Sequence, residues 1–196
     1  MLPQRLIDRF HELLAAAEAA GEPEPTAMSL ATVDDLGQPC VRVVLLKALD
    51  ARGFSFYTNT ESDKGRQLAS QPRAAICFLW KHLDQVVQVR AQGAVEAVDD
   101  AEADAYFASR PYGSQIGAWA SDQSRPLADR ATLERRIAEA QARFAGAPVP
   151  RPPHWGGYRL VPDRLEFWHG REYRLHDRFV FEREESNNWR ESRLFP

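Results

Sequence analysis

The chain has 196 residues, a length that fits one domain with a buried core and needs no disulfide or metal to fold. Its net charge of -3 and its pI near 6.0 argue against general attraction to nucleic acid or anionic lipid, so we expect neither partner. Its two cysteines, Cys40 and Cys77, are too few for a disulfide framework and lack the spacing of a metal site.

The N-terminal segment predicts an amphipathic helix. Apolar residues recur at helical spacing from Leu6 to Ala17, which extends the helix to about Ala20. Residues 21–27, which begin with GEPEP, then form a linker. Charges run through the whole segment, and no apolar run of the chain is long enough to cross a bilayer. We therefore expect a cytoplasmic protein.

Short β-rich runs replace the helical pattern from Met28 onward, separated by turn signals such as DDLGQP and DARG. Five of them fit an antiparallel meander that curls into a barrel to remove its edges. After a proline-rich connector, four more runs complete the same sheet. The predicted runs begin at Met28, Cys40, Gly53, Ala74 and Gln85, and then at Gly157, Arg164, Arg178 and Asn188. We expect a single domain over 1–196, mainly β, whose residues 28–196 form a barrel with peripheral helices.

Three helices are predicted outside the barrel. Ser62 is the expected cap of a short helix at 63–70, and Asp99 is the expected cap of a helix at 100–110. A longer amphipathic helix spans 128–146 and ends at a glycine.

Two of these helices carry groups that can bind an anion. Lys64 lies in the first turn of a helix, where free backbone N–H groups and a lysine together can hold a phosphate. Tyr106 and Arg110 are four residues apart on one helix face, and Ser114 follows in a Pro/Gly turn, so the three can donate to one anion. A solvated lysine and an arginine at a helix C-terminus are the ordinary alternatives.

Two predicted strands also carry cations. In RVVLLK, Arg42 and Lys47 leave a mostly apolar strand in opposite directions, and solvent or a salt bridge would satisfy them as well as a ligand. In EYRLHDRF, strand alternation places Arg174, His176 and Arg178 on one face. Three neighbouring cations repel one another unless an anion lies across them, so this stretch favours an anionic ligand. A solvated outer face is the alternative, which the apolar runs on either side of the stretch disfavour.

Several motifs occur together in a recognisable order: RVVLLK, FYTN, YFASRP, SQIGAW, WGGYRL, EFW and RLHDRF. From about Thr26 to its last residues the chain resembles the pyridoxine/pyridoxamine 5′-phosphate oxidases. The resemblance implies a split β-barrel flavoprotein that binds FMN at a homodimer interface and converts pyridoxine 5′-phosphate and pyridoxamine 5′-phosphate to pyridoxal 5′-phosphate. It also implies that the substrate C4′ carbon gives a hydride to flavin N5, and that oxygen then reoxidises the flavin and yields hydrogen peroxide.

The resemblance assigns residues to two ligands. The residues implied for FMN are Arg42, Val43, Val44, Leu45, Leu46, Lys47, Tyr57, Thr58, Lys64, Gln88, Gln123, Ser124, Trp168 and Arg178. The residues implied for the substrate are Lys47, Tyr106, Arg110 and Ser114 at its phosphate, and Arg174, Leu175 and His176 near its pyridine ring. Arg174 and His176 are the implied catalytic residues, with His176 either accepting a proton or positioning the ring.

Three features depart from the family pattern. Asp63 stands where relatives often have a basic residue, which weakens the expected phosphate site. The segment before Gln88 is two residues longer than in common relatives, so Gln85 is the alternative flavin contact. Many relatives have an N-terminal arm that folds over the substrate, and this chain starts too late to include it, so we expect a different lid or none.

Two other classes of function stay open. A related FMN oxidase of another ring substrate, as in phenazine biosynthesis, would share the fold and some motifs, although the full set of phosphate contacts favours a phosphorylated substrate. A non-catalytic flavin or haem binder built on the same barrel would have no need of Arg174 and His176.

Overall fold

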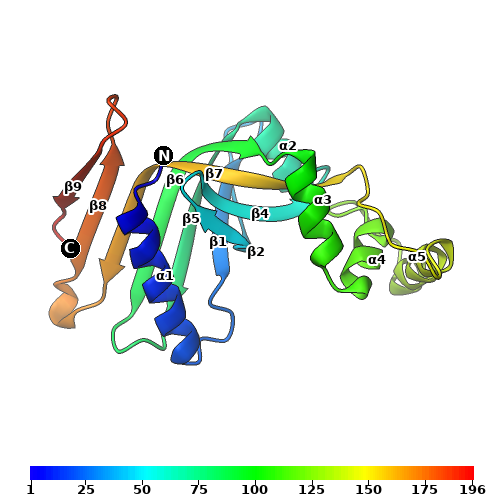
Figure 1. Ribbon diagram of the computed structural model, residues 1–196, viewed down its shortest axis with the longest axis horizontal. Coiled ribbons are helices and arrows are strands. Elements are labelled where there is room, and N and C mark those ends of the chain that lie inside the picture. The colour runs from blue at the N-terminus through cyan, green and yellow to red at the C-terminus, as the bar shows by residue number, and fades with distance from the viewer.

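The computed structural model describes residues 1–196 and contains one antiparallel sheet of nine strands (Figure 1). The strands are β1 (Ala27–Val33), β2 (Pro39–Leu45), β3 (Ala48–Asp50), β4 (Gly53–Asn59), β5 (Arg73–Trp80), β6 (Val87–Ala97), β7 (Trp155–His169), β8 (Asp177–Arg183) and β9 (Trp189–Arg193). Their order is β2-β1-β5-β6-β7-β4-β3, and β8 and β9 continue from β7. The mainly β prediction is confirmed. The simple meander is wrong, because β5 pairs with β1 and β4 pairs with β7.

Helices surround this curled sheet. They are α1 (Gln4–Ala19), α2 (Asp63–Ser70), α3 (Asp100–Ser109), α4 (Tyr112–Ala120) and α5 (Arg130–Arg143). The predicted caps of α2 and α3 are confirmed, because Ser62 and Asp99 each accept a hydrogen bond from a backbone N–H of their helix. None of the helices has the length and apolar character that crossing a bilayer requires.

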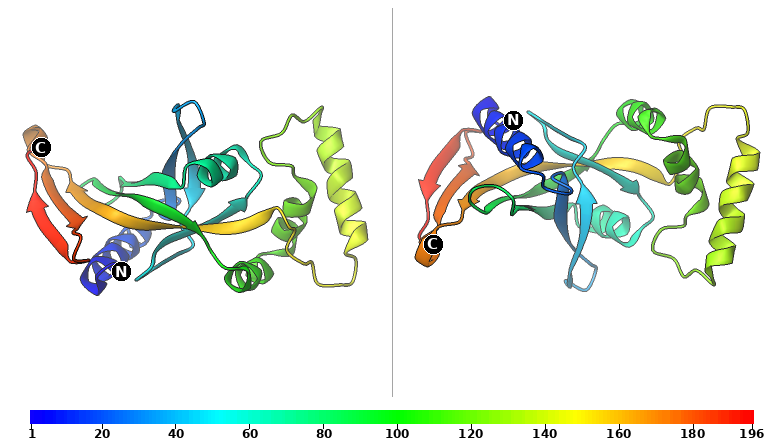
Figure 2. Two further views of the ribbon diagram at one scale, coloured as in Figure 1. Left: turned by 90° about the horizontal axis from the view of Figure 1, so that it is seen from above. Right: turned by 90° about the horizontal axis from the view of Figure 1, so that it is seen from below.

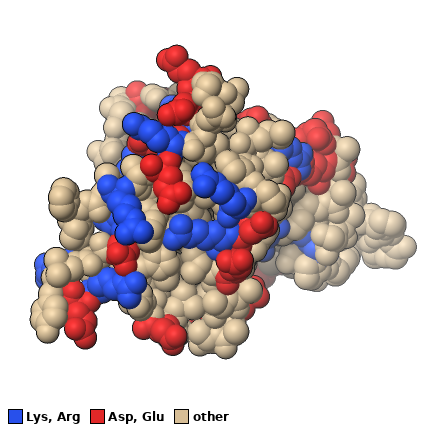
Figure 3. All heavy atoms as spheres, turned by 60° about the vertical axis from the view of Figure 1, so that its left-hand side comes forward, with Lys and Arg blue, Asp and Glu red and all other residues tan.

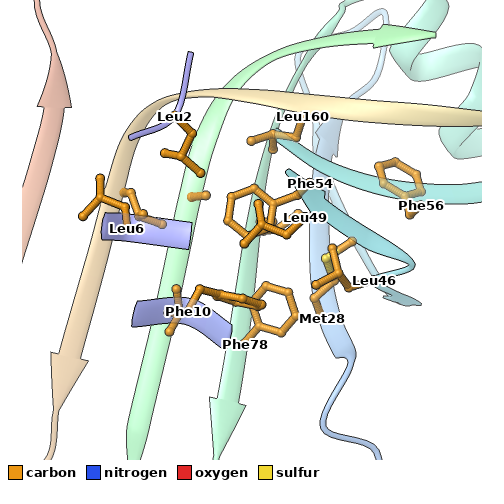
Figure 4. Close-up of a cluster of buried hydrophobic side chains, with 14 of the residues drawn as sticks. Leu2, Leu6, Phe10, Met28, Leu46, Leu49, Phe54, Phe56, Phe78 and Leu160 are labelled. Atoms are coloured by element: carbon orange, nitrogen blue, oxygen red, sulfur yellow. The ribbon is translucent and has the colours of Figure 1, made fainter. Parts of the chain in front are cut away.

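The main core lies between α1 and the sheet (Figure 4). Phe10 of α1 is fully buried, and its ring centroid lies 5.4 Å from that of Phe54 on β4 and 5.0 Å from that of Phe78 on β5. Burying an aromatic side chain of this size is worth about 1.5–3 kcal/mol. The helical spacing of the N-terminal apolar residues therefore serves to cover the sheet.

A second, smaller core holds α3, α4 and α5 against the start of β7. It contains Phe107, Ile116, Phe144 and Trp155 among its buried residues. Figure 2 shows these helices at one end of the molecule and the β8–β9 hairpin at the other.

Three predicted elements differ in the structure. The run from Cys40 is two strands, because the backbone N–H of Leu46 donates to Thr26 and that of Lys47 donates to Ser55 outside the β1–β2 ladder. The runs from Gly157 and Arg164 form the single strand β7. The predicted Pro/Gly turn that carries Ser114 is helix α4.

The prediction that Arg174, His176 and Arg178 share one face of a strand is also wrong. β7 and β8 end their pairing at His169 and Asp177, so the intervening residues form a loop that reverses the chain. Within this loop Tyr173 has φ 56° and Arg174 has φ 62°, which is left-handed backbone and not strand. Only Arg178 of the three cations lies in β8.

Candidate active site

One cavity of about 920 Å³ opens between β2, β4, α2 and α3. Many of the residues predicted for the two ligands line it, namely Arg42, Val43, Val44, Leu45, Lys47, Tyr57, Thr58, Lys64, Tyr106, Arg110, Ser114, Gln123 and Ser124. The side chain of Leu46 does not line it, because Leu46 is buried in the main core. The fold therefore brings segments that are far apart in the sequence to one hollow.

Lys64 is a buried cation at the start of α2. Ser62 caps this helix. Gly65 lets the helix pack closely against the backbone of Thr60, since a Cβ at position 65 would lie 2.1 Å from the Thr60 oxygen. Lys64 Nζ donates to Ser62 Oγ at 3.1 Å and to Gln123 Oε1 at 2.5 Å, and neither acceptor is a carboxylate. Burial, with a smaller contribution from Arg42, lowers the pKa of Lys64 to about 8. An anion in the cavity would relieve this cost.

Arg42 lies beside the same cavity. Its guanidinium donates to Thr32 Oγ1, to Gln67 Oε1 at 3.1 Å and to backbone carbonyls, all of which are neutral acceptors. Lys47 is exposed at the cavity and, like Arg42, has no ion-pair partner. Solvent can hydrate the exposed ammonium group of Lys47. The salt bridge that was the alternative for Arg42 is absent.

Aromatic rings form one wall of the cavity. The ring of Tyr57 stacks on Tyr106 at a centroid distance of 4.0 Å and on Trp155 at 5.4 Å. Gly157 makes room for Tyr57, because a Cβ at that position would lie 2.6 Å from the ring. The guanidinium of Arg110 lies 4.9 Å from the centroid of Trp155, and its Nη1 is buried with no hydrogen-bond partner. Such a donor calls for an acceptor supplied by a ligand or by water.

Ion pairs fix the helix that carries Tyr106. Arg159 of β7 is buried and donates to both carboxylate oxygens of Glu102 on α3 at 2.7 Å. Arg151 donates to Asp104 at 2.5 Å and to Asp100 at 2.7 Å. These contacts hold the first half of α3 against β7 and against the segment that precedes β7.

A second group of predicted residues lies in one row across three other strands. Gln88 on β6 pairs with Trp168 on β7, and Trp168 pairs with Arg178 on β8. Gln85 precedes β6 and belongs to no row. The strand register therefore favours Gln88 over Gln85 as the third member of this set.

The loop before β8 carries the predicted catalytic residues. Arg174 and Leu175 are exposed, and the His176 ring lies 4.4 Å from Trp168 by ring centroids. His176 Nδ1 accepts a hydrogen bond from the backbone N–H of Arg171 at 3.1 Å. A neutral imidazole held this way carries its proton on Nε2 and presents a donor there.

The cavity and the Gln88–Trp168–Arg178 row are far apart in one chain. Trp155 at the cavity and Trp168 in the row are separated by the length of β7, a path of about 43 Å at about 3.3 Å per residue. Figures 1 and 2 show β7 running from the α3–α5 end of the molecule to the β8 end. A single chain therefore does not bring the two predicted groups together.

Sequence reasoning missed two residues beside these groups. Trp155 stacks in the cavity wall, and its place before two glycines in WGGYRL was the available signal. Glu166 is 2% exposed on β7 and pairs with Arg178 and Arg90. Its signal was a lone acid in the apolar run LEFW. Figure 3 shows acidic and basic side chains interleaved on the side of the molecule seen there.

Comparison with known proteins places the chain in a family. The model of the family "Pyridoxamine 5′-phosphate oxidase" matches residues 14–144, and that of the "Pyridoxine 5′-phosphate oxidase C-terminal dimerisation region" matches 155–196. A "Pyridoxine/pyridoxamine 5′-phosphate oxidase" of Myxococcus xanthus is 58% identical over 196 residues, covering 100% of this chain and 94% of that protein.

Two solved structures resemble the fold. PhzG from Burkholderia lata 383, crystallised with tetrahydrophenazine-1-carboxylic acid, has a TM-score of 0.90 and 35% identity, covering 100% of this chain and 93% of that one. A pyridoxamine 5′-phosphate oxidase-related, FMN-binding protein of Nostoc punctiforme has a TM-score of 0.77 and 19% identity, covering 100% and 98%. The second likeness supports the split-barrel fold alone. From the two family regions and the 58% identity, the chain belongs to the pyridoxamine 5′-phosphate oxidase family.

Proposed function

We propose that this chain is an FMN-dependent oxidase that converts pyridoxine 5′-phosphate and pyridoxamine 5′-phosphate to pyridoxal 5′-phosphate. Its family membership and the 58% identity to a relative of that name support the activity. The observation that carries the proposal is the cavity with Lys64, Arg42 and Arg110, three cations that are at least partly buried and lack a carboxylate partner. Buried cations without partners are costly, and phosphate groups would compensate them.

The cavity residues divide between two phosphates. Lys64, Arg42 and the N-terminus of α2 hold the phosphate of FMN, because charge and free N–H groups converge there. Arg110 and Tyr106 hold the phosphate of the substrate together with Lys47 and Ser114. Binding at the phosphate, remote from the reacting carbon, then orients the substrate ring.

The loop residues act at the ring of the substrate. Bound FMN supplies the electron acceptor for the substrate, and oxygen is the final acceptor that yields hydrogen peroxide. His176 donates through Nε2–H to a ring substituent, which makes it a group that positions the substrate as long as Arg171 holds Nδ1. Arg174 is exposed and contributes its guanidinium to the same ring.

A homodimer completes the site. The row of Gln88, Trp168 and Arg178 is remote from the cavity of its own chain, so a second copy must supply these residues to the cofactor. The match of residues 155–196 to a dimerisation region supports this arrangement. The proposal also includes a cytoplasmic location, since Cys40 and Cys77 are free thiols that a reducing compartment preserves.

The phenazine-type oxidase is the second candidate. The likeness to PhzG in fold favours it, but the identity of 35% is lower than the 58% shared with the Myxococcus oxidase. The cations at the cavity favour a substrate that carries a phosphate.

Anaerobic reduction tests the proposal. The purified protein should have the yellow absorbance of bound flavin, and pyridoxine 5′-phosphate added without oxygen should bleach it. Unphosphorylated pyridoxine serves as the control and should bleach it far more slowly at equal concentration. Fully loaded flavin that stays yellow with both pyridoxine 5′-phosphate and pyridoxamine 5′-phosphate would contradict the oxidase assignment.

A further inference from the structure

Glu166 is a buried carboxylate at the centre of a group of arginines. It lies on β7, is 2% exposed, and stands two residues before Trp168, so it shares a face of the sheet with the row of Gln88, Trp168 and Arg178. Its Oε1 accepts from Arg178 Nε at 2.8 Å and its Oε2 from Arg178 Nη2 at 3.2 Å. Oε2 also accepts from Arg90 Nη2 at 2.5 Å. Both carboxylate oxygens are therefore engaged.

These contacts keep Glu166 ionised. Burial alone would raise the pKa of its carboxyl group, but the hydrogen bonds from Arg178 and Arg90 hold that pKa below its usual value. A neutral carboxylic acid would lose one acceptor and repel an arginine N–H with its own proton. The pairing geometry thus depends on the negative charge.

The contacts also fix how Arg178 is presented. Glu166 takes Nε–H and one N–H of Nη2, and the backbone oxygen of Phe195 accepts from Nη1 at 3.2 Å. One N–H on Nη1 and one on Nη2 remain for another acceptor. Two-point pairing of a guanidinium with a carboxylate sets the plane of the guanidinium as well as its position.

We propose that Glu166 is a positioning residue that aims the free N–H groups of Arg178 at the flavin of the completed site. This inference rests on the proposed function, in which Arg178 contacts FMN. Glu166 does not touch the cofactor in this account, and it acts through Arg178. The carboxylate also compensates part of the charge that Arg90 and Arg178 add to this face.

A purely structural role for Glu166 is the alternative, because its pairs also link β6, β7 and β8. Glu182 on β8 offers a matched control. It also pairs with arginines, Arg164 and Arg190, but it contacts none of the residues proposed for FMN, and its only link to Glu166 is Arg164, whose Nη2 lies 3.9 Å from Glu166 Oε2.

The test compares FMN affinity with stability. Glu166→Gln should raise the Kd for FMN, measured by flavin fluorescence, by about tenfold, as expected when one charge-assisted hydrogen bond loses its alignment. Glu166→Asp keeps the charge and should recover part of the affinity, whereas Glu182→Gln should leave the Kd unchanged. A Glu166→Gln protein with a lower Tm and a Kd within twofold of wild type would overturn the proposal.

A double-mutant cycle separates positioning from a general effect on the fold. In an Arg178→Ala background, Glu166→Gln should change the Kd for FMN no further, because the residue that it positions is gone. Additive losses would overturn the proposal. If Glu166→Gln does not fold, the same cycle with Glu166→Asp decides. An Arg178→Ala protein with unchanged FMN affinity would contradict the flavin contact of Arg178 itself, a failure distinct from that of Glu166.

Discussion

Cations at the cavity and cations on the face of β6–β8 are compensated in different ways. Lys64 and Arg110 line the cavity. Lys64 donates only to neutral acceptors, and Arg110 Nη1 has no hydrogen-bond partner at all. Arg90 and Arg178 share the carboxylate of Glu166. In the first region the missing negative charge indicates a ligand, and in the second the protein supplies it.

This difference separates the residues proposed to bind a ligand from the residue proposed to position another side chain. An unpaired buried cation costs stability until an anion arrives, so its removal should harm binding more than folding. A paired cation is already stabilised, and its carboxylate sets its direction. Loss of a cation at the cavity should therefore weaken ligand binding without lowering stability, whereas loss of the Glu166 carboxylate should leave two arginines without their partner.

Removal of the Lys64 charge should have the largest effect. Lys64→Met keeps the length of the side chain and should raise the Kd for FMN by about 100-fold, the scale of a charge-assisted hydrogen bond in a buried site. The Tm of the protein without FMN should stay the same or rise, because a desolvated cation is gone. Titration of FMN and a thermal melt measure both; a lower Tm with unchanged Kd would mean that Lys64 is structural.

Arg110 tests the substrate side of the cavity. Arg110→Ala should raise KM for pyridoxine 5′-phosphate by about 30-fold and leave the Kd for FMN unchanged, because it removes a contact to the substrate phosphate. Arg143 is a matched control, since it also lies over aromatic rings, at 4.6 Å from the centroid of Trp119, but does not line the cavity. An equal loss in Arg143→Ala would show that the ring contact, and not the phosphate, explains the effect.

The pKa of Lys64 predicts a pH dependence of FMN binding. Its protonated form binds phosphate, and with a pKa of about 8 it is largely protonated below that pH and loses its proton above it. The Kd for FMN should therefore rise as the pH passes 8, by up to about tenfold per pH unit. Lys64→Arg should abolish this rise, because a guanidinium stays charged. A flat profile in the wild-type protein would contradict the assignment.

Asp63 should have the smallest effect. It lines the cavity, but its carboxylate pairs with Arg66 at 2.5 Å on the surface, so its charge is partly compensated. Asp63→Asn should tighten FMN binding by about two- to fivefold. Arg66→Gln should act in the opposite direction, because it leaves Asp63 unpaired near the phosphate. A change of the same sign in both variants would exclude this electrostatic account.

Local signals in the sequence predicted much of the cavity. Ser62 capped its helix as expected because a cap needs only a side chain and the N–H groups that follow it. Helix α4 was missed because Pro111 and Gly113 resemble a turn, whereas in the fold the side-chain amide of Gln115 on α4 donates to backbone oxygens at the end of α3 and so anchors the helix.

Long-range pairing decided what the sequence could not predict. The turn at Tyr173 lies where the pairing of β7 with β8 ends, at His169 and Asp177. No local sequence pattern specifies which residues of two strands pair. The resemblance named Arg178, but only the fold shows that Glu166 holds it. The sequence could therefore name Arg178, which is proposed to bind a ligand, but not Glu166, which is proposed to position it.

Complementation between two variants tests most directly whether the cavity and the β8 end of different chains form one site. Arg110→Ala and Arg174→Ala would be co-produced with different affinity tags, and the mixed dimer would be purified. At substrate concentrations well below the raised KM of Arg110→Ala, each variant alone should have little activity, whereas the mixed dimer should regain about half the wild-type activity, because one of its two sites receives both intact halves. A mixed dimer no more active than the two parents would contradict the shared site.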